Sequence, residues 1–428
     1  MVMEANMKLN YGKTFLLGFG FLGVSVIWGV YNAFVPVFLQ SKFGLDIRWI
    51  GFFMTLDNIA ALLIQPPVGA WSDRTRTPIG RRMPFILIGA PIGAVAFGII
   101  PIAQILPVFV ACTSTLLISM AFWRTPVVAL MPDITPSQFR SQANGIINLM
   151  GGLGFIVATL VGAALYEKNN AYPFWMGSIL VIVAALMVFI FIKEPKVHES
   201  TEQQPGMFKS LQFLAQEQDK SGLRILLAIF FWFLAYSAIE AFFTLYSKNY
   251  LGIGEANGAR LLSQLSLAFV IFALPAGFIG GRIGRRVTIM SGILVMTAVM
   301  LAIYVIPVST LITQVTKLPV LGVVPVIGLL LMVAGVGWAL ININSFPMVV
   351  DLTTLERVGT YTGLYYLFST LSAIVGPNLN SWLIKLTGDN YNSIMLMGPV
   401  FMLVALVLMV GVKRGEAVKP ELAAGIGD

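Results

Sequence analysis

Long apolar runs recur along the whole of this 428-residue chain. Each is about 20 residues or longer, and a helix of that length crosses the roughly 30 Å hydrocarbon core of a bilayer. A helix also satisfies its own backbone hydrogen bonds, as a segment surrounded by lipid must. The runs predict an all-α polytopic membrane protein with twelve transmembrane helices, at about 13–40, 49–72, 83–103, 107–130, 141–165, 174–192, 223–250, 260–281, 287–307, 321–350, 360–384 and 394–412.

Composition supports a membrane protein. Hydrophobic residues make up 57% of the chain and charged residues 11%, which is far from the surface chemistry of a soluble domain. The first run is too long for a cleaved signal peptide and lacks a small-residue cleavage pattern, so we expect it to be the first transmembrane helix. The single cysteine, Cys112, excludes an intramolecular disulfide. No cluster has metal-ligand spacing, so we expect no metal site.

The distribution of lysine and arginine predicts the orientation. Placing the amino terminus in the cytoplasm collects most of the 27 basic residues on the cytoplasmic side, as the positive-inside rule requires. Both termini are then cytoplasmic. The net charge of +8 is interpreted as a topology signal and a match to anionic lipid headgroups, and we expect no nucleic-acid partner.

The predicted helices divide into two groups of six. We expect an amino-terminal bundle at 1–192, a cytoplasmic linker at 193–222 and a carboxy-terminal bundle at 223–428. The bundles share motifs: GAWSDRTRTPIGRR after the second span returns as GFIGGRIGRR after the eighth. In the same way Asp133 and Arg140, between the fourth and fifth spans, are matched by Asp351 and Arg357. Such repetition indicates two pseudo-symmetric halves related by an axis normal to the membrane.

These motifs resemble the major facilitator superfamily. Gly-x-x-x-Asp-Arg followed by Gly-Arg-Arg is similar to the family's loop between helices 2 and 3, which implies a cytoplasmic latch for the outward-facing state. The resemblance assigns this latch to Gly69, Asp73, Arg74, Arg81 and Arg82, and the repeat adds Asp133, Arg140, Arg282, Arg285, Arg286, Asp351 and Arg357. Because Gly281 stands where the second copy should carry the acid, we expect a weaker latch in that half.

A narrower resemblance covers about half of the amino-terminal bundle. The stretch LLIQPPVGAWSDRTRTPIGRRMPFIL, from Leu62 to Leu87, is similar to the sucrose/proton symporters of plants and their animal and bacterial relatives, a glycoside and cation symporter-like group. It implies import of a sugar, a disaccharide such as sucrose or maltose, coupled to protons. In that family a proton-binding aspartate precedes a proline that matches Pro126; here the corresponding position is Leu117, so this coupling residue is not carried over.

Coupling residues were therefore sought among ionisable groups inside the predicted spans, since a charge there is costly unless it has a partner or a cavity. Three stand out: Asp57, Arg124 and Glu240. Asp57 and Glu240 are both candidate proton carriers, and the sequence leaves open which one acts. Arg124 is expected to keep a nearby acid deprotonated until substrate arrives, with permanent pairing to backbone carbonyls as the alternative. A buried acid satisfied by a neighbouring helix is the alternative for Asp57.

A sugar site needs amide and hydroxyl hydrogen bonds together with aromatic faces. The candidates inside the spans are Trp28, Tyr31, Asn32, Asn148, Tyr236, Glu240, Asn342 and Asn344. Packing of the aromatics and interhelical hydrogen bonding of the asparagines are the competing interpretations.

The resulting hypothesis is a monomeric plasma-membrane transporter, not an enzyme, that imports a sugar by alternating access. It needs no cofactor beyond a coupling proton, with sodium left open. A proton-driven exporter of drugs or small metabolites shares the fold and the charged loop, and is the main alternative. A transport-inactive receptor is a third.

Overall fold

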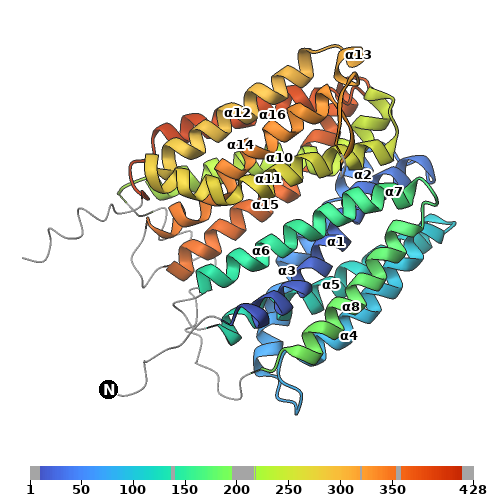
Figure 1. The fold of residues 1–428 in the computed structure, drawn as a ribbon, viewed down its shortest axis with the longest axis vertical. Coiled ribbons are helices and arrows are strands. Elements are labelled where there is room, and N and C mark those ends of the chain that lie inside the picture. Colours follow the sequence, from blue (N-terminus) through green and yellow to red (C-terminus); the bar gives the residue numbers. More distant parts are fainter. Residues whose placement is uncertain are drawn as a thin grey trace, which may run out of the picture. The chain divides into compact units, whose positions relative to one another are not determined.

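The computed structural model describes residues 10–135, 140–194, 216, 218–318, 321–352 and 358–416. Helices dominate (Figure 1). Those in the first half of the sequence are α1 (Tyr11–Ser41), α2 (Ile47–Phe53), α3 (Leu56–Arg74), α4 (Met83–Ile99), α5 (Leu106–Ile134), α6 (Arg140–Ile156), α7 (Gly162–Tyr166) and α8 (Tyr172–Phe191). Those in the second half are α10 (Ser221–Tyr246), α11 (Glu255–Ile283), α12 (Arg285–Val305), α13 (Val308–Leu311), α14 (Val326–Val350), α15 (Val358–Leu386) and α16 (Ser393–Val410).

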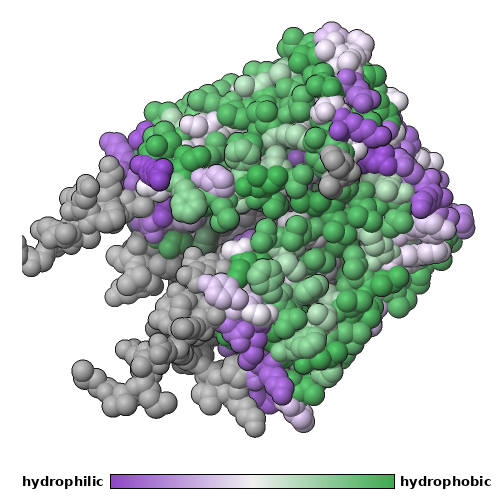
Figure 2. Space-filling model, viewed as in Figure 1, coloured by the Kyte–Doolittle hydropathy of each residue, from purple (hydrophilic) through white to green (hydrophobic). Residues whose placement is uncertain are grey.

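The all-α membrane architecture is confirmed. Within the described residues, 11 helical stretches are long and apolar enough to cross a bilayer. The predicted span at 360–384 coincides with α15, which is long enough but more polar than the others. Figure 2 shows apolar side chains along the flanks of the helices and hydrophilic ones gathered at their ends. That distribution is the one a bilayer imposes on a helical protein.

Three details differ from the predicted spans. The second span is interrupted at Met54 and Thr55, between α2 and α3. Short π-helical segments, η3 (Val157–Val161) and η4 (Ser247–Leu251), continue the fifth and seventh spans. A hairpin of β1 (Gln314–Leu318) and β2 (Gly322–Pro325) precedes α14. The tenth span was predicted to begin at residue 321, which was wrong because Gly322–Pro325 form a strand and α14 begins at Val326.

The described chain divides into two compact units. Unit 1 comprises Met1–Asp46, Leu56–Ser200 and Glu255–Ser263, and unit 2 comprises Ile47–Thr55, Thr201–Gly254 and Gln264–Asp428. Each unit thus includes a short segment from the other half of the sequence. In unit 2 the segment that contains α2 packs on α15, where Asn378 donates a hydrogen bond to the Thr55 hydroxyl (3.3 Å). The predicted bundle and linker boundaries at 192 and 223 stay a prediction.

Helix α1 is the core of unit 1. It packs against α5, α6 and α8, and small residues allow these close approaches. Any Cβ at Gly23 would lie 2.8 Å from the Ala184 Cβ, and one at Gly29 would lie 2.6 Å from the Ala158 Cβ. Gly154 of α6 similarly faces the Leu22 backbone. Close contact of small residues replaces hydrophobic burial as the main source of helix association in lipid.

Unit 2 is organised around α10, which packs on α15 and α16, and around α12, which packs on α14 and α16. The α12–α14 contact again depends on glycine: a Cβ at Gly292 would lie 2.6 Å from the Gly337 carbonyl oxygen. In α14 the buried Asn344 side chain donates to the carbonyls of Ala276 (3.1 Å) and Leu340 (3.0 Å). This polar contact fastens α14 to α11.

Candidate functional sites in the two units

The charged cluster of unit 1 joins α3, α4 and α5. Asp133 of α5 accepts hydrogen bonds from the guanidinium groups of Arg81 (2.6 Å) and Arg82 (3.1 Å), which immediately precede α4. Asp73 of α3 forms a second ion pair with Arg82 (2.5 Å) and lies 3.9 Å from Arg81. The Arg82 guanidinium also donates to the Ser72 hydroxyl. Two almost fully buried arginines are therefore neutralised by two carboxylates on different helices.

A third carboxylate completes this cluster. Glu194, just beyond α8, accepts hydrogen bonds from the backbone N–H groups of Arg81 (2.8 Å), Arg82 (2.9 Å) and Met83 (3.0 Å). These are donors that a helix N-terminus leaves unsatisfied, and an anion there is also favoured by the helix dipole. Gly80 has a φ of +113°, and a Cβ at this position would lie 2.6 Å from the Glu194 carboxylate. Glycine is therefore required at position 80, because of the positive φ and because a side chain would collide with the Glu194 carboxylate.

Unit 2 repeats this arrangement with one member missing. Arg285 pairs with Asp351, as Arg81 pairs with Asp133. Arg286, the counterpart of Arg82, donates instead to the backbone carbonyls of Met409 (3.1 Å) and Val410 at the end of α16. The counterpart of Asp73 is Gly281, and no described atom lies within 4 Å of a Cβ placed there. The second acid is absent and its place is open.

The helix cap, by contrast, is present in both units. Glu416, just beyond α16, accepts from the N–H groups of Arg285 (2.6 Å) and Arg286 (2.9 Å). Gly284 precedes them with a φ of +99°, and its Cβ would lie 3.1 Å from the Glu416 carboxylate. Sequence reasoning missed Glu194 and Glu416. The available signal was an acid within a few residues of the end of the sixth and the twelfth span.

The remaining predicted latch residues are placed less fully. Gly69 accepts a hydrogen bond from Ser72 through its carbonyl (2.9 Å). Arg74 and Arg282 are exposed at the ends of α3 and α11. Arg140 begins α6, but its side chain lies outside the described residues, as does the whole of Arg357. The contacts described above for each cluster join residues of one unit, so each cluster ties together helices of one repeat.

Unit 1 brings several of the predicted membrane-embedded residues together. Asp57 is half-buried, accepts a hydrogen bond from Asn58 (2.8 Å) and lies within electrostatic range of Tyr31. Tyr31 is fully buried, and its hydroxyl has no hydrogen-bond partner among the described residues. The Trp28 ring meets that of Tyr31 edge to face at 5.7 Å. A buried hydroxyl left unsatisfied beside a carboxylate is the kind of group that a proton or a ligand completes.

The other candidate residues of unit 1 are Asn32, Arg124 and Asn148. Asn32 lies one residue beyond Tyr31 and is half-buried. Arg124 of α5 is half-buried and engaged with a neighbour. Asn148 of α6 is exposed. These placements neither assign a role to the three residues nor remove one.

In unit 2, Glu240 and Tyr236 are one helical turn apart on α10 and interact electrostatically. The Tyr236 ring stacks on that of Trp338 of α14, with centroids 3.9 Å apart and planes 1° from parallel. Asn342 is half-buried one turn beyond Trp338. The amide of Asn344 is used in the contact between α14 and α11 described above. Trp338 had not been singled out from the sequence.

This stacked pair belongs to a larger aromatic cluster. Phe233 meets Trp338 edge to face at 5.2 Å, and Tyr365 of α15 meets Phe346 at 5.2 Å and Tyr366 at 5.5 Å. The Tyr365 hydroxyl is hydrogen-bonded to Ser345 (3.1 Å). Rings from α10, α14 and α15 therefore form a continuous aromatic surface in unit 2.

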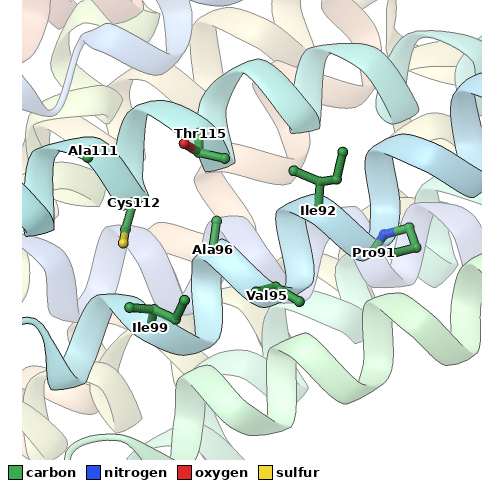
Figure 3. Close-up of a pocket in the computed structure, with 8 residues that line it drawn as sticks. All are labelled: Pro91, Ile92, Val95, Ala96, Ile99, Ala111, Cys112 and Thr115. Atoms are coloured by element: carbon green, nitrogen blue, oxygen red, sulfur yellow. The ribbon is translucent and has the colours of Figure 1, made fainter.

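A separate groove of about 450 Å³ lies between α4 and α5 (Figure 3). Its lining is almost wholly apolar, with Cys112 and Thr115 the exceptions among Pro91, Ile92, Val95, Ala96, Ile99 and Ala111. None of the predicted substrate or coupling residues contributes to it. An apolar groove on a membrane-spanning surface contacts hydrocarbon, so it is not taken as the substrate site.

The segment beyond α16 is fastened to the start of α10. Asp219 accepts hydrogen bonds from the N–H and hydroxyl groups of Ser221 (2.9 and 2.8 Å) and pairs with Arg414. The Ser221 hydroxyl in turn accepts from the Lys413 N–H (3.0 Å). These contacts, the Ser221 N–H foremost, lower the pKa of the Asp219 carboxyl.

Three features describe the class of protein. Both units contain long apolar helices, the charge clusters recur after the second and eighth spans, and ionisable groups lie inside the spans. Together they define a helical membrane transporter built of two repeats. A family model described as Major Facilitator Superfamily matches residues 17–377 and 261–426, and the chain belongs to this superfamily. Solved structures agree in fold. A point mutant of the nucleoside transporter NupG superposes with a TM-score of 0.71 at 17% identity, covering 94% of this chain and 100% of that one. A bacterial homolog of the human lysosomal transporter Spinster superposes with a TM-score of 0.74 at 13% identity, covering 94% of this chain and 97% of that one.

Relatives of known function are distant and diverse. Multidrug resistance protein 2 of Bacillus subtilis is 24% identical over 62% of this chain and 65% of its own length. The general alpha-glucoside permease of Schizosaccharomyces pombe is 24% identical over 59% of this chain and 52% of its own. The sucrose transport protein SUC3 of Arabidopsis thaliana is 25% identical over 33% of this chain and 27% of its own length. The chain covers less than two thirds of each of these three relatives.

Proposed function

We propose that this chain is a secondary active transporter that imports a sugar, of disaccharide size, together with protons by alternating access. The observation that carries the proposal is an acid beside a tyrosine in each unit: Asp57 near Tyr31, and Glu240 near Tyr236. A carboxyl group in this setting changes its proton affinity when the surrounding cavity fills or empties. Phenol and indole groups nearby supply the hydrogen bonds and flat faces that sugars bind.

Each polar residue then has an assigned role. Asp57 or Glu240 carries the proton, and Arg124 keeps the carrier ionised until substrate arrives. The proposed sugar-binding residues are Trp28, Tyr31, Asn32, Asn148, Tyr236 and Asn342. Asn344 is retained only as a positioning residue, since its amide donates to two backbone carbonyls. The similarity to a sucrose transport protein and an alpha-glucoside permease supports the substrate class.

The charge clusters complete the proposal. We place them on the cytoplasmic side of the plasma membrane, with both termini, because the basic residues concentrate there. In unit 1, Asp73, Arg81, Arg82 and Asp133 hold α3, α4 and α5 together at that side. Alternating access requires each repeat to move as a body about a midplane site, and a cluster of this kind keeps the ends of its helices together during that motion.

A second function, proton-driven export of hydrophobic compounds, is favoured by the aromatic cluster of unit 2. Phe233, Trp338, Phe346, Tyr365 and Tyr366 offer apolar and cation-binding faces over three helices. Several relatives of this chain are multidrug or quinolone resistance proteins. The two functions share the fold and differ in the chemistry of the cargo.

Proton movement in proteoliposomes separates these functions. With the purified full chain reconstituted, adding sucrose or maltose outside should acidify the interior, and either Glu240→Gln or Asp57→Asn should abolish the signal. Asp389→Asn, which removes an exposed acid paired with Lys385, is the matched control and should leave it intact. Absence of sugar-dependent acidification, together with dye extrusion driven by an imposed proton gradient, would reject sugar import and establish export.

A further inference from the structure

At the matched positions of the two charge clusters, the described residues of unit 2 have one carboxylate fewer than those of unit 1. At matched positions, unit 1 sets Arg74, Arg81 and Arg82 against Asp73, Asp133 and Glu194. Among the described residues at the matched positions, unit 2 sets Arg282, Arg285 and Arg286 against Asp351 and Glu416. The missing carboxylate corresponds to Gly281, where the described structure leaves open space.

The three arginines of unit 2 are not equally engaged. Arg286 has its guanidinium donors turned to backbone carbonyls at the end of α16, where the helix dipole supplies partial negative charge. Arg285 forms an ion pair with Asp351, whose side chain is 41% exposed. Arg282 is exposed, and the part of the chain that the structure describes offers it no ion pair. Gly281 and Arg282 are adjacent at the end of α11, and Arg285 begins α12 four residues after Gly281.

An apolar surface runs from this gap along α11. Leu274, Phe278 and Arg282 follow one another at intervals of four residues, and so share one helix face. Leu274 is 76% exposed and Phe278 is 72% exposed. A charged group at the end of a membrane span with two large exposed apolar side chains below it matches an amphiphile with an anionic head and a hydrocarbon chain. The corresponding residues of α3 are Pro66, Ala70 and Arg74, which offer much less apolar surface.

We propose that unit 2 binds the phosphate of an anionic phospholipid between Gly281, Arg282 and Arg285, with an acyl chain of that lipid along Leu274 and Phe278. The lipid phosphate supplies the negative charge that Asp73 supplies in unit 1. The charge complement of this cluster is thereby supplied by the membrane, and the two repeats differ in their dependence on lipid composition.

Native mass spectrometry of the full chain tests the site, with phosphatidylglycerol, phosphatidylcholine and inorganic phosphate as separate probes. Phosphatidylglycerol should bind the unmodified chain more tightly than phosphatidylcholine does. Gly281→Asp, which fills the gap with a carboxylate, and Arg282→Gln should each weaken phosphatidylglycerol binding about fivefold, the effect of one basic contact at a membrane surface. Arg74→Gln, the matched change in unit 1, should leave it unchanged.

The probes also separate two sources of phosphate. A variant-dependent gain in thermal stability with phosphatidylglycerol and none with inorganic phosphate supports a lipid site. An equal, variant-dependent gain with inorganic phosphate would overturn the lipid assignment in favour of a soluble anion. If Gly281→Asp and Arg282→Gln bind phosphatidylglycerol as tightly as Arg74→Gln does, the site does not exist. Arg282 is exposed, so Arg282→Gln is expected to fold. It keeps the test decisive if Gly281→Asp does not fold.

Discussion

The clusters of unit 1 and unit 2 have the same plan but different depths of burial. Both place an arginine pair at the start of a helix, an acid from the end of the following membrane span against the first arginine, and a glutamate cap on the backbone. In unit 1 the arginine side chains are 9% and 5% exposed and meet two acids. The matched pairs differ in exposure: the Arg81 and Asp133 side chains are 9% and 12% exposed, and the Arg285 and Asp351 side chains are 18% and 41% exposed. Since burial strengthens charge interactions, the repeat that lacks one acid also has the more solvated and weaker ion pair.

The largest expected difference between the units comes from removing the shared acid. Asp133→Asn leaves two buried guanidinium groups with only Asp73, and should cost about 3 to 5 kcal/mol of unfolding free energy, as breaking a buried pair does. Asp351→Asn in unit 2 should cost about 1 kcal/mol or less because that pair is partly exposed. Thermal unfolding of the purified variants measures both, and equal losses would contradict the distinction drawn from burial.

The helix caps should respond alike, with a smaller difference. Glu194→Ala removes the acceptor of three backbone N–H groups, and Glu416→Ala that of two. Each should destabilise the protein by about 1 to 2 kcal/mol, with the larger loss in unit 1. Hydrogen exchange at the first turns of α4 and α12 locates the effect. If exchange increases elsewhere but not in these turns, the glutamates are not acting as caps.

Restoring the missing acid should reduce the asymmetry. Gly281→Asp places a carboxylate in open space at the position that matches Asp73, and should raise stability by up to about 1 kcal/mol in detergent without anionic lipid. Because glycine is unfavourable inside a helix, some of this gain comes from the backbone. Gly281→Ala serves as the control for that part. A gain no larger than that of Gly281→Ala would mean that the arginines do not use the new acid.

The smallest effect concerns the attachment of the carboxy-terminal segment in unit 2. The pKa of Asp219 is lowered from the ordinary value of 3.8 by its hydrogen bonds to Ser221 and by Arg414. A carboxyl whose pKa is lower in the folded state stabilises that state above the ordinary pKa, and the contribution is lost as pH falls through the lowered one. The difference in melting temperature between the unmodified chain and Asp219→Asn should therefore be constant near neutral pH and shrink below about pH 3.8. If the difference in melting temperature stays constant over the whole pH range, the ionised Asp219 carboxylate does not contribute to stability.

Several elements of the fold followed from local pattern alone. Each predicted span is mainly helical because about 20 apolar residues in lipid have few other ways to satisfy their backbone. The matched loops Gly69–Arg82 and Gly277–Arg286 revealed the repeat before any contact was known. The hairpin before α14 was missed because a run such as VLGVVPV is equally compatible with a strand and with the start of an apolar helix.

The charge clusters were only partly predictable. Asp73, Asp133 and the arginine pairs were identified from the motif and its repeat. Glu194 and Glu416 were not, since a carboxylate more than 100 residues away in sequence caps a helix only once the helices have packed. The same holds for Trp338, whose stacking on Tyr236 joins α14 to α10. Asn344 shows the converse, as a polar residue expected in the substrate site proved to bond to backbone carbonyls.

By itself, the sequence determined that the protein is a polytopic helical membrane protein with two similar halves, because hydropathy and repetition are local properties of the chain. It also supplied the titratable groups on which any coupling depends. Only the tertiary structure decided which charges meet, which polar groups remain unsatisfied and which short segments belong to which unit. Those outcomes depend on distances between residues far apart in sequence, and such distances are set by how small residues let particular helices approach one another.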